Sequence, residues 1–415
     1  MIEIQSKSKN AFCQNGAFRF TVLALLYWLG LYFANYLTVY LQGLGMSSAV
    51  VGYVNSAAAA TGMIGNFVIG RISDRYRTVK WVTVLTLVMT GIMFILFPLT
   101  SNVIVFGLSL AVLWWPIACL FRSPGSSLVE NWIVRSSYSE HFNYGVVRAG
   151  GSLGSFLSSV LASGLVTALC AYLAQVEAVA ATYYIGGGLL VLSALYALTV
   201  PEVKPNESSR QKKPDIRLSR LFKNYYFMAL LLFYFALNVF INPPYVFLPY
   251  IMDESGIDTG LLGIIIGWEA LLELPMLFLL VVLRKRFKLH VLLITGGVLF
   301  ALTTFGQGIS TNLPMLLICG VLFGFANSLS FSCGFNFIYC IAPEEIRATA
   351  HTMYTIAGAV GITVGNLFAG ILVDWLGARA FYRLFALLTL LVCLLYALSF
   401  SVGRRVLHQQ LQDTA

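Results

Sequence analysis

The stretch PEVKPNESSRQKKPDIRLSR, residues 201–220, determines the organisation of this chain because it is the only long polar segment among apolar ones. It is rich in proline, serine and charge, which is typical of a linker. The rest of the chain is strongly apolar: 59% of all residues are hydrophobic, 10% are charged, and the mean hydropathy is +0.82. Since a soluble domain carries about a quarter charged residues, this composition indicates a membrane protein.

Twelve apolar segments flank the linker, six on each side. A membrane-spanning helix needs about 20 mostly apolar residues. We therefore predict an all-α membrane protein with twelve transmembrane helices in two six-helix halves, residues 1–200 and 225–415, joined by a cytoplasmic linker at 201–224. The predicted spans are 18–42, 48–71, 79–99, 102–133, 144–173, 179–200, 225–251, 257–283, 288–309, 312–341, 348–376 and 380–402.

The distribution of lysine and arginine predicts the orientation of the spans. If the spans alternate through the membrane, most of the 26 basic residues fall on the same side as the N-terminus. Cytoplasmic loops carry the excess of Lys and Arg, so we expect a multi-pass protein of the cell inner membrane with both termini in the cytoplasm. The first 16 residues lack the apolar core of a signal peptide. The net charge of +9 is then a topology signal, and no nucleic-acid partner is expected.

The two halves share a short glycine pattern. RAGGSLGSFLSS (148–159) in the fifth span aligns with TIAGAVGITVGN (355–366) in the eleventh, with glycines at the fourth and seventh positions of both. Small residues at such intervals let helix backbones approach closely. Glycine-rich helices also recur in unrelated membrane proteins, but the position in the fifth span of each half favours an internal duplication.

Five charged residues lie within or at the edge of the spans: Arg122, Glu130, Arg148, Glu269 and Glu273. A charge at bilayer depth is costly and usually faces a water-filled cavity, so it marks a path for a solute or a proton. These charges predict a transporter. The sequence shows no nucleophile–base pair, metal cluster or phosphate-binding loop. We therefore expect neither an enzyme nor a bound metal or cofactor, and no span has the polar stripe of a channel.

The turn GRISDRYRTVK (70–80), between the second and third spans, resembles the signature loop of the major facilitator superfamily. Members have two six-helix halves with the substrate site at their interface. The resemblance implies that this turn acts as a gate between two conformations. Gly70 would permit close helix packing, and Asp74 and Arg75 follow it in the turn. The resemblance also implies that Asp74 contacts the start of the eleventh span and a basic residue ending the fourth, Arg135, and that these contacts break during alternation. The alternative is a basic cytoplasmic turn that only obeys the positive-inside rule.

The segment LVENWIVRSSYSEHFNYGVVRAGGSLG (128–154) is similar to spans four and five of the lactose permease family and its oligosaccharide and nucleoside symporter relatives. In that family a glutamate and an arginine form a pair that holds the sugar, and Glu130 and Arg148 match them. A carboxylate accepts hydrogen bonds from hydroxyls, and a guanidinium donates to them. The alternative is a pair that snorkels at the cytoplasmic interface, because Arg148 lies only a few residues past the loop.

Span eight adds Glu269 and Glu273 within GWEALLELPMLF (267–278). Four residues apart, they share a helix face at about 6 Å. Two carboxylates this close in a low dielectric resist being charged together, so one of them could hold a proton. The resemblance implies that Glu269 contacts sugar and that Glu273 matches a glutamate of the nucleoside symporters. The alternative is that both are packing residues bound to a neighbouring helix.

The chain departs from the lactose permease pattern in two other spans. Where that family has a proton-relay histidine and glutamate in span ten, this chain offers Asn327. Where that family has an aspartate pair in span seven, this chain has Asn238 and Asn242. Proton coupling would then run through the glutamates of spans four and eight. We expect Asn327 and Asn242, with Asn35 and Trp268, to contact the substrate.

Arg122 has no basic counterpart in that family. It precedes Glu130 by eight residues, just over two turns, so the two share roughly one helix face. A second buried arginine suggests an anionic group on the substrate or a second partner for Glu130. We therefore predict proton-coupled symport of a small polar solute such as a sugar or nucleoside. The alternative is transport or exchange of an organic or aromatic anion by Arg122 and Arg148. The expected partners are this solute, protons and the lipid bilayer, and we expect a monomer.

Overall fold

The structure is a computed structural model that describes residues 15–105, 107–202, 219–342 and 346–405. Almost all of these residues are helical, and the only strands among them are β1 (Ile104–Val105) and β2 (Leu108–Ser109). Nine helices of the described part are long and apolar enough to cross a membrane. The predicted all-α membrane fold is therefore confirmed.

The chain folds into two compact units. Unit 1 comprises Met1–Gly45, Ala57–Arg210 and Gly260–Gly267, and unit 2 comprises Met46–Ser56, Gln211–Thr259 and Trp268–Ala415. The helix that runs over Ser48–Tyr76 contributes residues to both units. The 3₁₀ turn over Thr259–Leu261 and the helix over Leu262–Leu283 are divided in the same way, because Gly260–Gly267 belongs to unit 1. The predicted linker at 201–224 falls mainly on residues 203–218, which lie outside the described part of the chain.

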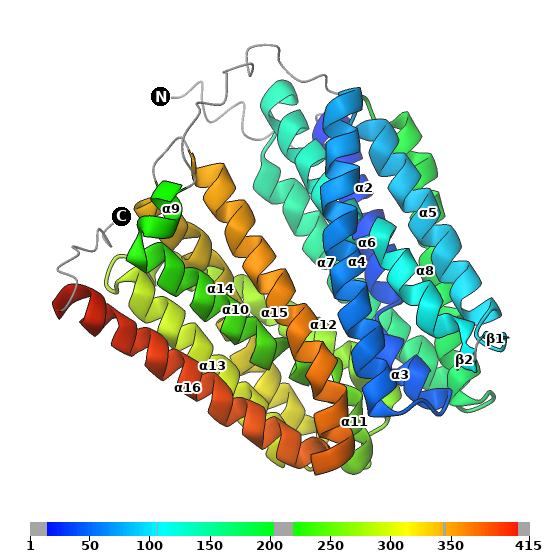
Figure 1. Cartoon of the computed structure of the whole chain (residues 1–415). Helices are drawn as coiled ribbons and strands as arrows, with labels where there is room; N and C mark the ends of the chain where they lie inside the picture. Colours follow the sequence, from blue (N-terminus) through cyan, green and yellow to red (C-terminus); the bar gives the residue numbers. More distant parts are fainter. Residues whose placement is uncertain (1–14, 106, 203–218, 343–345, 406–415) are drawn as a thin grey trace. The chain divides into compact units, whose positions relative to one another are not determined.

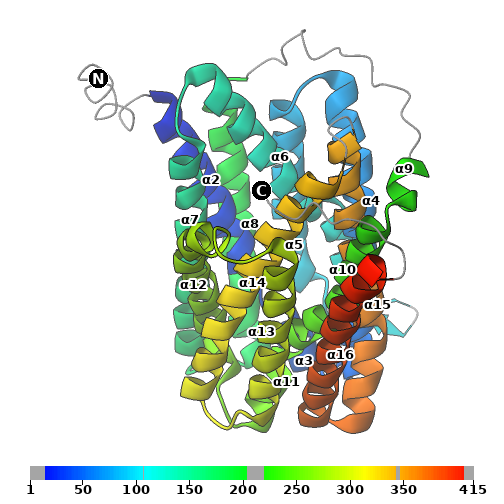
Figure 2. The same cartoon turned by 90° about the vertical axis from the view of Figure 1, so that its left-hand side faces the viewer.

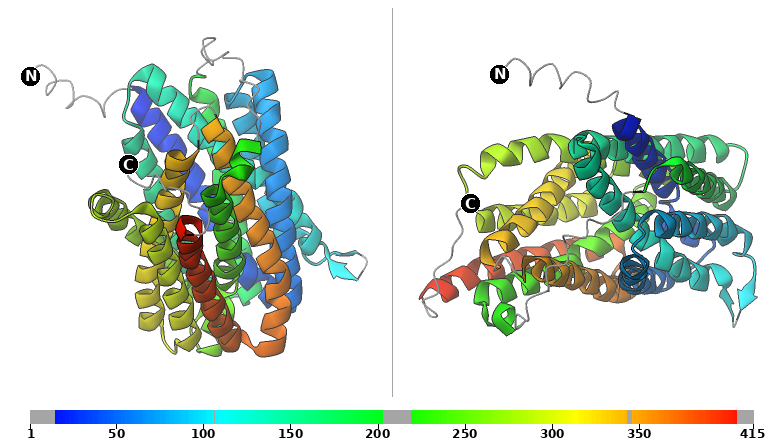
Figure 3. Two further views of the ribbon diagram at one scale, coloured as in Figure 1. Left: turned by 60° about the vertical axis from the view of Figure 1, so that its left-hand side comes forward. Right: turned by 90° about the horizontal axis from the view of Figure 1, so that it is seen from above.

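Unit 1 is a bundle of long helices (Figure 1). In it α7 packs along α2, α8 packs against both α2 and α5, and α6 packs against α5. The β1–β2 hairpin projects from the helices beside α6 (Figure 3). The helices are α2 (Asn15–Phe33), α3 (Leu37–Gly43), α4 (Ser48–Tyr76), α5 (Lys80–Leu99), α6 (Leu110–Glu140), α7 (Tyr144–Leu169) and α8 (Gln175–Thr199).

Unit 2 is a second bundle, in which α13 packs against α14 and α16, and α10 packs against α15 and α16 (Figure 2). Its core is aliphatic and aromatic, with Phe227, Phe233 and Phe337 buried among leucines. Three predicted spans, the second, fourth and eighth, are not among the nine helices that are long and apolar enough to cross a membrane. They correspond to α4, α6 and α12. The helices are α9 (Ser219–Lys223), α10 (Tyr225–Val246), α11 (Leu248–Glu254), the 3₁₀ turn η2 (Thr259–Leu261), α12 (Leu262–Leu283), α13 (Leu289–Ile309), α14 (Leu313–Ile341), α15 (Arg347–Leu376) and α16 (Ala378–Arg405).

The first predicted span, 18–42, is not one continuous helix. α2 ends at Phe33 and α3 begins at Leu37, so a short irregular segment around Asn35 interrupts it. Beside this break, the Tyr36 hydroxyl donates to the Gly260 carbonyl oxygen at 3.0 Å, and it accepts from the N–H of Gly263 at 3.0 Å. These bonds tie the break to a segment of unit 1 that is more than two hundred residues away in sequence.

The fourth predicted span, 102–133, is displaced along the chain. The β1–β2 hairpin occupies its first residues, and α6 begins only at Leu110 because Ser109 caps the helix by accepting from Ala111 N–H at 3.3 Å. The helix then continues to Glu140. Its 31 residues span about 46 Å, which exceeds a hydrocarbon core of about 30 Å. The end of α6 therefore extends beyond the apolar layer.

The seventh predicted span, 225–251, is also divided. α10 ends at Val246, and a short second helix, α11, begins at Leu248. Pro249 occupies the first turn of α11. Proline lacks the N–H that a continuing helix would need, but it suits a helix start.

The glycine-rich segments of α7 and α15 make the same kind of contact, each within its own unit. A Cβ added to Gly154 of α7 would lie 2.7 Å from the carbonyl oxygen of Leu25 in α2. A Cβ added to Gly361 of α15 would strike the carbonyl oxygen of Phe235 in α10. The two glycines are 207 positions apart in the sequence (361 − 154), and the residues they pack against are 210 positions apart (235 − 25). The pair α2 and α7 therefore corresponds closely to the pair α10 and α15. The glycine pattern in the sequence is therefore accompanied by a repeat of backbone packing.

Replacing Gly154 by alanine is expected to lower the melting temperature of the detergent-solubilised protein. The new methyl group must displace the backbone of α2, and overpacking costs about 1–3 kcal/mol. Gly164, on the same helix, is the matched control because an added Cβ there would meet no atom within 4 Å. Gly164→Ala should leave the melting temperature unchanged or slightly higher. Equal melting temperatures for the two variants would contradict the close packing of α7 on α2.

Candidate functional site

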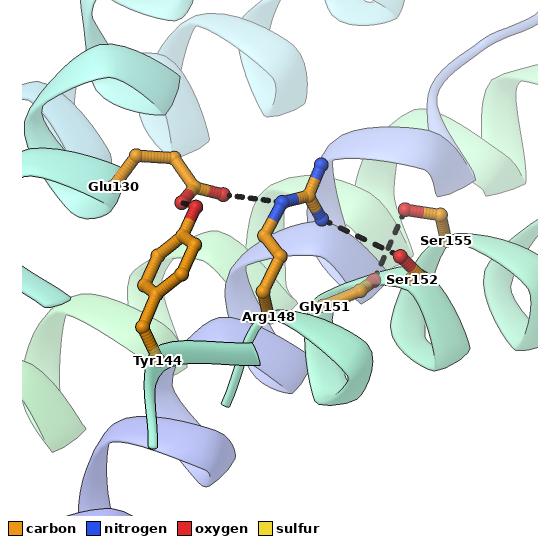
Figure 4. A network of polar contacts seen from close by, with 6 residues as sticks. All are labelled: Glu130, Tyr144, Arg148, Gly151, Ser152 and Ser155. Carbon is orange, nitrogen blue, oxygen red and sulfur yellow. Dashed lines mark hydrogen bonds and ion pairs between the residues drawn. The ribbon is translucent and has the colours of Figure 1, made fainter. Parts of the chain in front are cut away.

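Glu130 of α6 and Arg148 of α7 form an ion pair in unit 1 (Figure 4). The Arg148 Nε atom lies 3.0 Å from Glu130 Oε1, and the Tyr144 hydroxyl donates to Glu130 Oε2 at 2.8 Å. The Arg148 side chain keeps 41% of its surface exposed and that of Glu130 keeps 24%. The two predicted residues are thus brought together in an accessible pair, and their role in binding stays a prediction.

The short turn between α6 and α7 produces this geometry. His141 takes a left-handed conformation (φ 54°) that ends α6, and the Asn143 side chain caps α7 by accepting from a backbone N–H of its first turn at 2.8 Å. Tyr144 then begins α7 and reaches Glu130. Arg148 follows one helical turn later on the same face as Tyr144. An 18-residue separation therefore closes into a contact.

The Arg148 guanidinium has two further neighbours. Its Nη1 atom lies 3.5 Å from the Ser152 hydroxyl, one turn along α7 (Figure 4). Its Cζ atom lies 5.3 Å from the centre of the Trp28 ring in α2. A cation within about 6 Å of an indole face is attracted by the ring. The ion pair uses Nε and the serine contact uses Nη1, so Nη2 takes part in neither of these two contacts.

Arg122 precedes Glu130 on α6 but does not pair with it. Among the residues that the structure describes, Arg122 forms no ion pair. Its Cζ atom lies 5.8 Å from the centre of the Trp115 ring, and its buried Nε atom donates to no acceptor in the described part of the chain. A second pairing for Glu130, one of the two roles that the sequence left open, is therefore not present in this conformation. Substrate contact by Arg122 stays a prediction.

The two glutamates of α12, Glu269 and Glu273, lie in different surroundings within unit 2. Glu269 is 2% exposed, and neither of its carboxyl oxygens has a hydrogen-bond partner among the described residues. It packs against α14, where a Cβ added to Gly320 would lie 3.3 Å from Glu269 Cγ. Glu273 accepts a hydrogen bond from Asn327 Nδ2 at 2.6 Å. A buried ionised carboxylate needs such donors, so only Glu273 receives the support that a negative charge requires.

The other residues predicted to contact substrate are distributed over both units. Asn35 is half-buried in the break between α2 and α3 of unit 1. In unit 2, Trp268 donates its ring N–H to the carbonyl oxygen of Leu317 at 3.1 Å. Asn242 accepts from Asn366 Nδ2 at 3.0 Å, which links α10 to α15. Their contact with a substrate stays a prediction.

Asn366 is a polar residue of unit 2 that sequence reasoning did not single out. It is 1% exposed, and its Oδ1 atom has no hydrogen-bond partner within the described ranges. It is the last residue of the segment TIAGAVGITVGN (355–366). An asparagine within an apolar, glycine-rich span is the signal that could have identified it.

The turn predicted to act as a gate lies at the end of α4 in unit 1. Asp74 and Arg75 are exposed there, and Arg135 on α6 is half-buried. No ion pair joins Asp74 to Arg135 in the described residues, and a Cβ added to Gly70 would meet no atom within 4 Å. The close packing predicted at Gly70 and the Asp74–Arg135 contact are therefore absent from this conformation. Since the family resemblance implies that such contacts break as a transporter alternates, the gating role stays a prediction.

Several solved transporter structures share this fold. A variant of the nucleoside transporter NupG matches with a TM-score of 0.80 at 16% identity, over 93% of this chain and 100% of that chain. The D-xylose–proton symporter matches with a TM-score of 0.66 at 15% identity, over 92% of this chain and 97% of that chain. The human organic anion transporter MFSD10 matches with a TM-score of 0.59 at 15% identity, over 92% of this chain and 100% of that chain. At these identities the likeness shows the fold alone.

The family follows from the sequence match rather than from these structures. No curated protein sequence matches the chain. The profile of the MFS_1 like family matches residues 22–384, which is most of the chain. The resemblance to the major facilitator superfamily, predicted from the turn at 70–80, is thereby confirmed. The chain belongs to the MFS_1 like family and is a multi-pass membrane transporter, not an enzyme.

Proposed function

We propose that this transporter carries a small polar solute with several hydroxyl groups, such as a sugar or a nucleoside, together with protons by alternating access. The observation that carries the proposal is the Glu130–Arg148 ion pair with Tyr144 beside it. The carboxylate accepts hydrogen bonds from hydroxyls, and the guanidinium donates to hydroxyl and ring oxygens. Together they offer a neutral solute both acceptors and donors without requiring a charge on it.

The similar solved structures support this class of solute. One is a nucleoside transporter and another is a symporter of D-xylose and protons. Their sequence identities of 16% and 15% leave the solute of this chain to be argued from its own residues. The proposed solute class therefore rests on the ion pair rather than on the shared fold.

We propose that the proton travels on Glu269, with Glu273 as the second carboxylate of the coupling site. Glu269 is buried, and no residue that the structure describes donates a hydrogen bond to its carboxyl group. An ionised carboxylate left unpaired in an apolar interior costs several kcal/mol, so its surroundings favour the neutral acid. Asn327 supplies Glu273 with the donor that Glu269 lacks. Loading a proton on Glu269 on one side of the membrane and releasing it on the other would couple the two flows.

We further propose that the protein works as a monomer in the cell inner membrane, with both termini in the cytoplasm. The excess of Lys and Arg on one side of the predicted spans supports this orientation. The turn that carries Gly70, Asp74 and Arg75 would then face the cytoplasm, as would the end of α6 near Arg135. That is the side on which a cytoplasmic gate must lie.

The solute class is tested by screening the purified protein for ligands that raise its melting temperature. A ligand that binds only the folded state stabilises it by mass action. Neutral sugars and nucleosides are compared with aromatic acids, each on the wild type and on Glu130→Gln. We expect a neutral hydroxyl-bearing solute to stabilise the wild type and to lose this effect in the variant. Stabilisation by aromatic acids alone would favour the second candidate.

Arg122 favours this second candidate, the transport or exchange of an organic or aromatic anion. Its Nε atom is buried without an acceptor, and no ion pair neutralises it among the described residues. A carboxylate on the solute would supply the missing acceptor through charge-assisted hydrogen bonds. A human organic anion transporter shares the fold.

If the solute is an anion, Arg122→Gln is expected to weaken its binding about tenfold to hundredfold. The change removes a hydrogen bond to a charged group, which contributes about 1.5–3 kcal/mol, while a polar side chain stays at this position of α6. Calorimetric titration with a sugar acid and its neutral parent sugar measures the effect. A selective loss for the acid supports the anion function, and an equal change for both ligands contradicts it.

A further inference from the structure

Trp28 of α2 is the aromatic side chain against which the Arg148 guanidinium lies. The Arg148 Cζ atom lies 5.3 Å from the centre of the indole. On α2 itself, the rings of Tyr27 and Tyr32 lie against the indole, with ring centres at 5.1 Å and 5.7 Å. The indole is therefore held by its own helix while it contacts the arginine of the proposed solute site.

Gly151 of α7 makes room for this indole. A Cβ added at that position would lie 2.6 Å from Trp28 Cδ1, 2.8 Å from Trp28 Nε1 and 3.3 Å from Arg148 Nη1. Figure 4 shows Gly151 on the same stretch of α7 as Arg148 and Ser152. The indole and the guanidinium thus meet where the chain lacks a side chain. A larger residue at position 151 would push the indole away from the guanidinium.

The packing of the two helices does not itself require an indole at this position. In unit 2 the corresponding pair, α10 and α15, meets in the same way at Phe235 and Gly361. The residue of α10 that corresponds to Trp28 is Asn238 (238 − 28 = 210), and its amide donates to the Tyr234 carbonyl oxygen at 2.8 Å within its own helix. Gly358, the counterpart of Gly151, is covered instead by the ring of Tyr234, one turn earlier on α10 than Asn238. An aromatic ring therefore lies against this glycine in both units, but in unit 2 it does not come from the position that corresponds to Trp28. The indole of Trp28 differs from the Tyr234 ring in lying against an arginine.

We propose that Trp28 is a positioning residue for solute binding, which holds the Arg148 guanidinium so that Nη2 addresses the solute while Nε pairs with Glu130. The inference rests on the proposed function, because it takes Arg148 as a solute-binding residue. A free arginine side chain carries about 2 kcal/mol of rotamer entropy. If the ring already holds the guanidinium in place, solute binding loses less side-chain entropy when it fixes the arginine. Gly151 acts through Trp28 by leaving space for the indole.

Two substitutions of Trp28 separate its ring face from its apolar bulk. Trp28→Leu keeps an apolar side chain but removes the aromatic face, and it is expected to weaken solute binding about twofold to thirtyfold, as the loss of a cation–π contact predicts. Trp28→Phe keeps a ring and should retain most of the affinity. The KM of uptake into proteoliposomes should follow the affinity, while the rate at saturating solute changes little. Equal affinities in the two variants would overturn the proposal.

Gly151→Ala provides an independent route to the same result. Its methyl group should displace the indole and reproduce the loss seen in Trp28→Leu. In the Trp28→Leu background it should add less than twofold, because the shorter leucine no longer fills that space, whereas independent effects would add. Additive losses would overturn the role of Gly151 and Trp28 as a unit.

A wild type that binds no solute of the screen overturns the proposed function, and the role of Trp28 with it. A wild type that binds while Trp28→Leu binds equally well overturns the role of Trp28 alone.

Discussion

Lysine in place of Arg148 is expected to lower solute affinity about tenfold to hundredfold, although the positive charge is kept. The guanidinium pairs with Glu130 through Nε at 3.0 Å and has other N–H groups in the same fixed plane for the solute. A lysine ammonium is a compact charge on a flexible stem and lacks this planar fork. Each hydrogen bond to a charged group contributes about 1.5–3 kcal/mol, and the substitution removes at least one. Uptake of radiolabelled solute into proteoliposomes measures the loss.

Arg383 supplies the control for this substitution. It is exposed on α16 of unit 2, so Arg383→Lys makes the same chemical change away from α6 and α7 and should transport as the wild type does. Glu130→Gln should reproduce the loss, because a neutral amide cannot form the ion pair. A folded Arg148→Lys protein with the wild-type KM would contradict the ion pair as the solute site.

Glutamine in place of Glu269 is expected to abolish accumulation of solute against its gradient while leaving solute exchange intact. Glutamine resembles the neutral form of the acid, which the buried, unpaired position favours. It can neither take up nor release a proton, so a pH gradient can no longer drive the cycle. Accumulation in proteoliposomes with an imposed pH gradient should fall to simple equilibration, whereas counterflow between solute-loaded compartments should continue.

Two further glutamates test whether this effect is specific to Glu269. In Glu273→Gln the side-chain amide still offers an oxygen to Asn327, which donates at 2.6 Å in the wild type, so we expect a smaller loss of accumulation. Glu177 is exposed in the first turn of α8, and Glu177→Gln should accumulate solute normally. Full accumulation by Glu269→Gln would show that coupling runs through another group.

The ion pair could be predicted from the sequence because its geometry is local. Glu130 and Arg148 flank one short turn, so two adjacent helices bring them together whatever the rest of the chain does. The long apolar segments likewise predict membrane helices from composition alone. The glycine pattern identified the helices that pack closely, and the contact of Gly154 with the backbone of Leu25 gives that pattern a physical cause.

Other features depended on contacts between distant parts of the chain. The break at Asn35 contains neither glycine nor proline, and the Tyr36 hydroxyl beside it binds Gly260, a residue that no local pattern connects to it. Asn366 became a candidate only once α15 placed it against Asn242. Arg122 could be recognised as unusual, but whether it paired with Glu130 depended on side-chain directions that helical spacing does not determine.

The proposed coupling of solute and proton is tested most directly by the pH change that solute entry produces. Proteoliposomes without any ion gradient, loaded with a pH-sensitive dye, receive the solute identified by the thermal screen. The proposed function predicts acidification of the interior as solute enters, and no acidification in Glu269→Gln liposomes that still exchange solute. Entry of solute into wild-type liposomes without a change in internal pH would contradict proton-coupled symport.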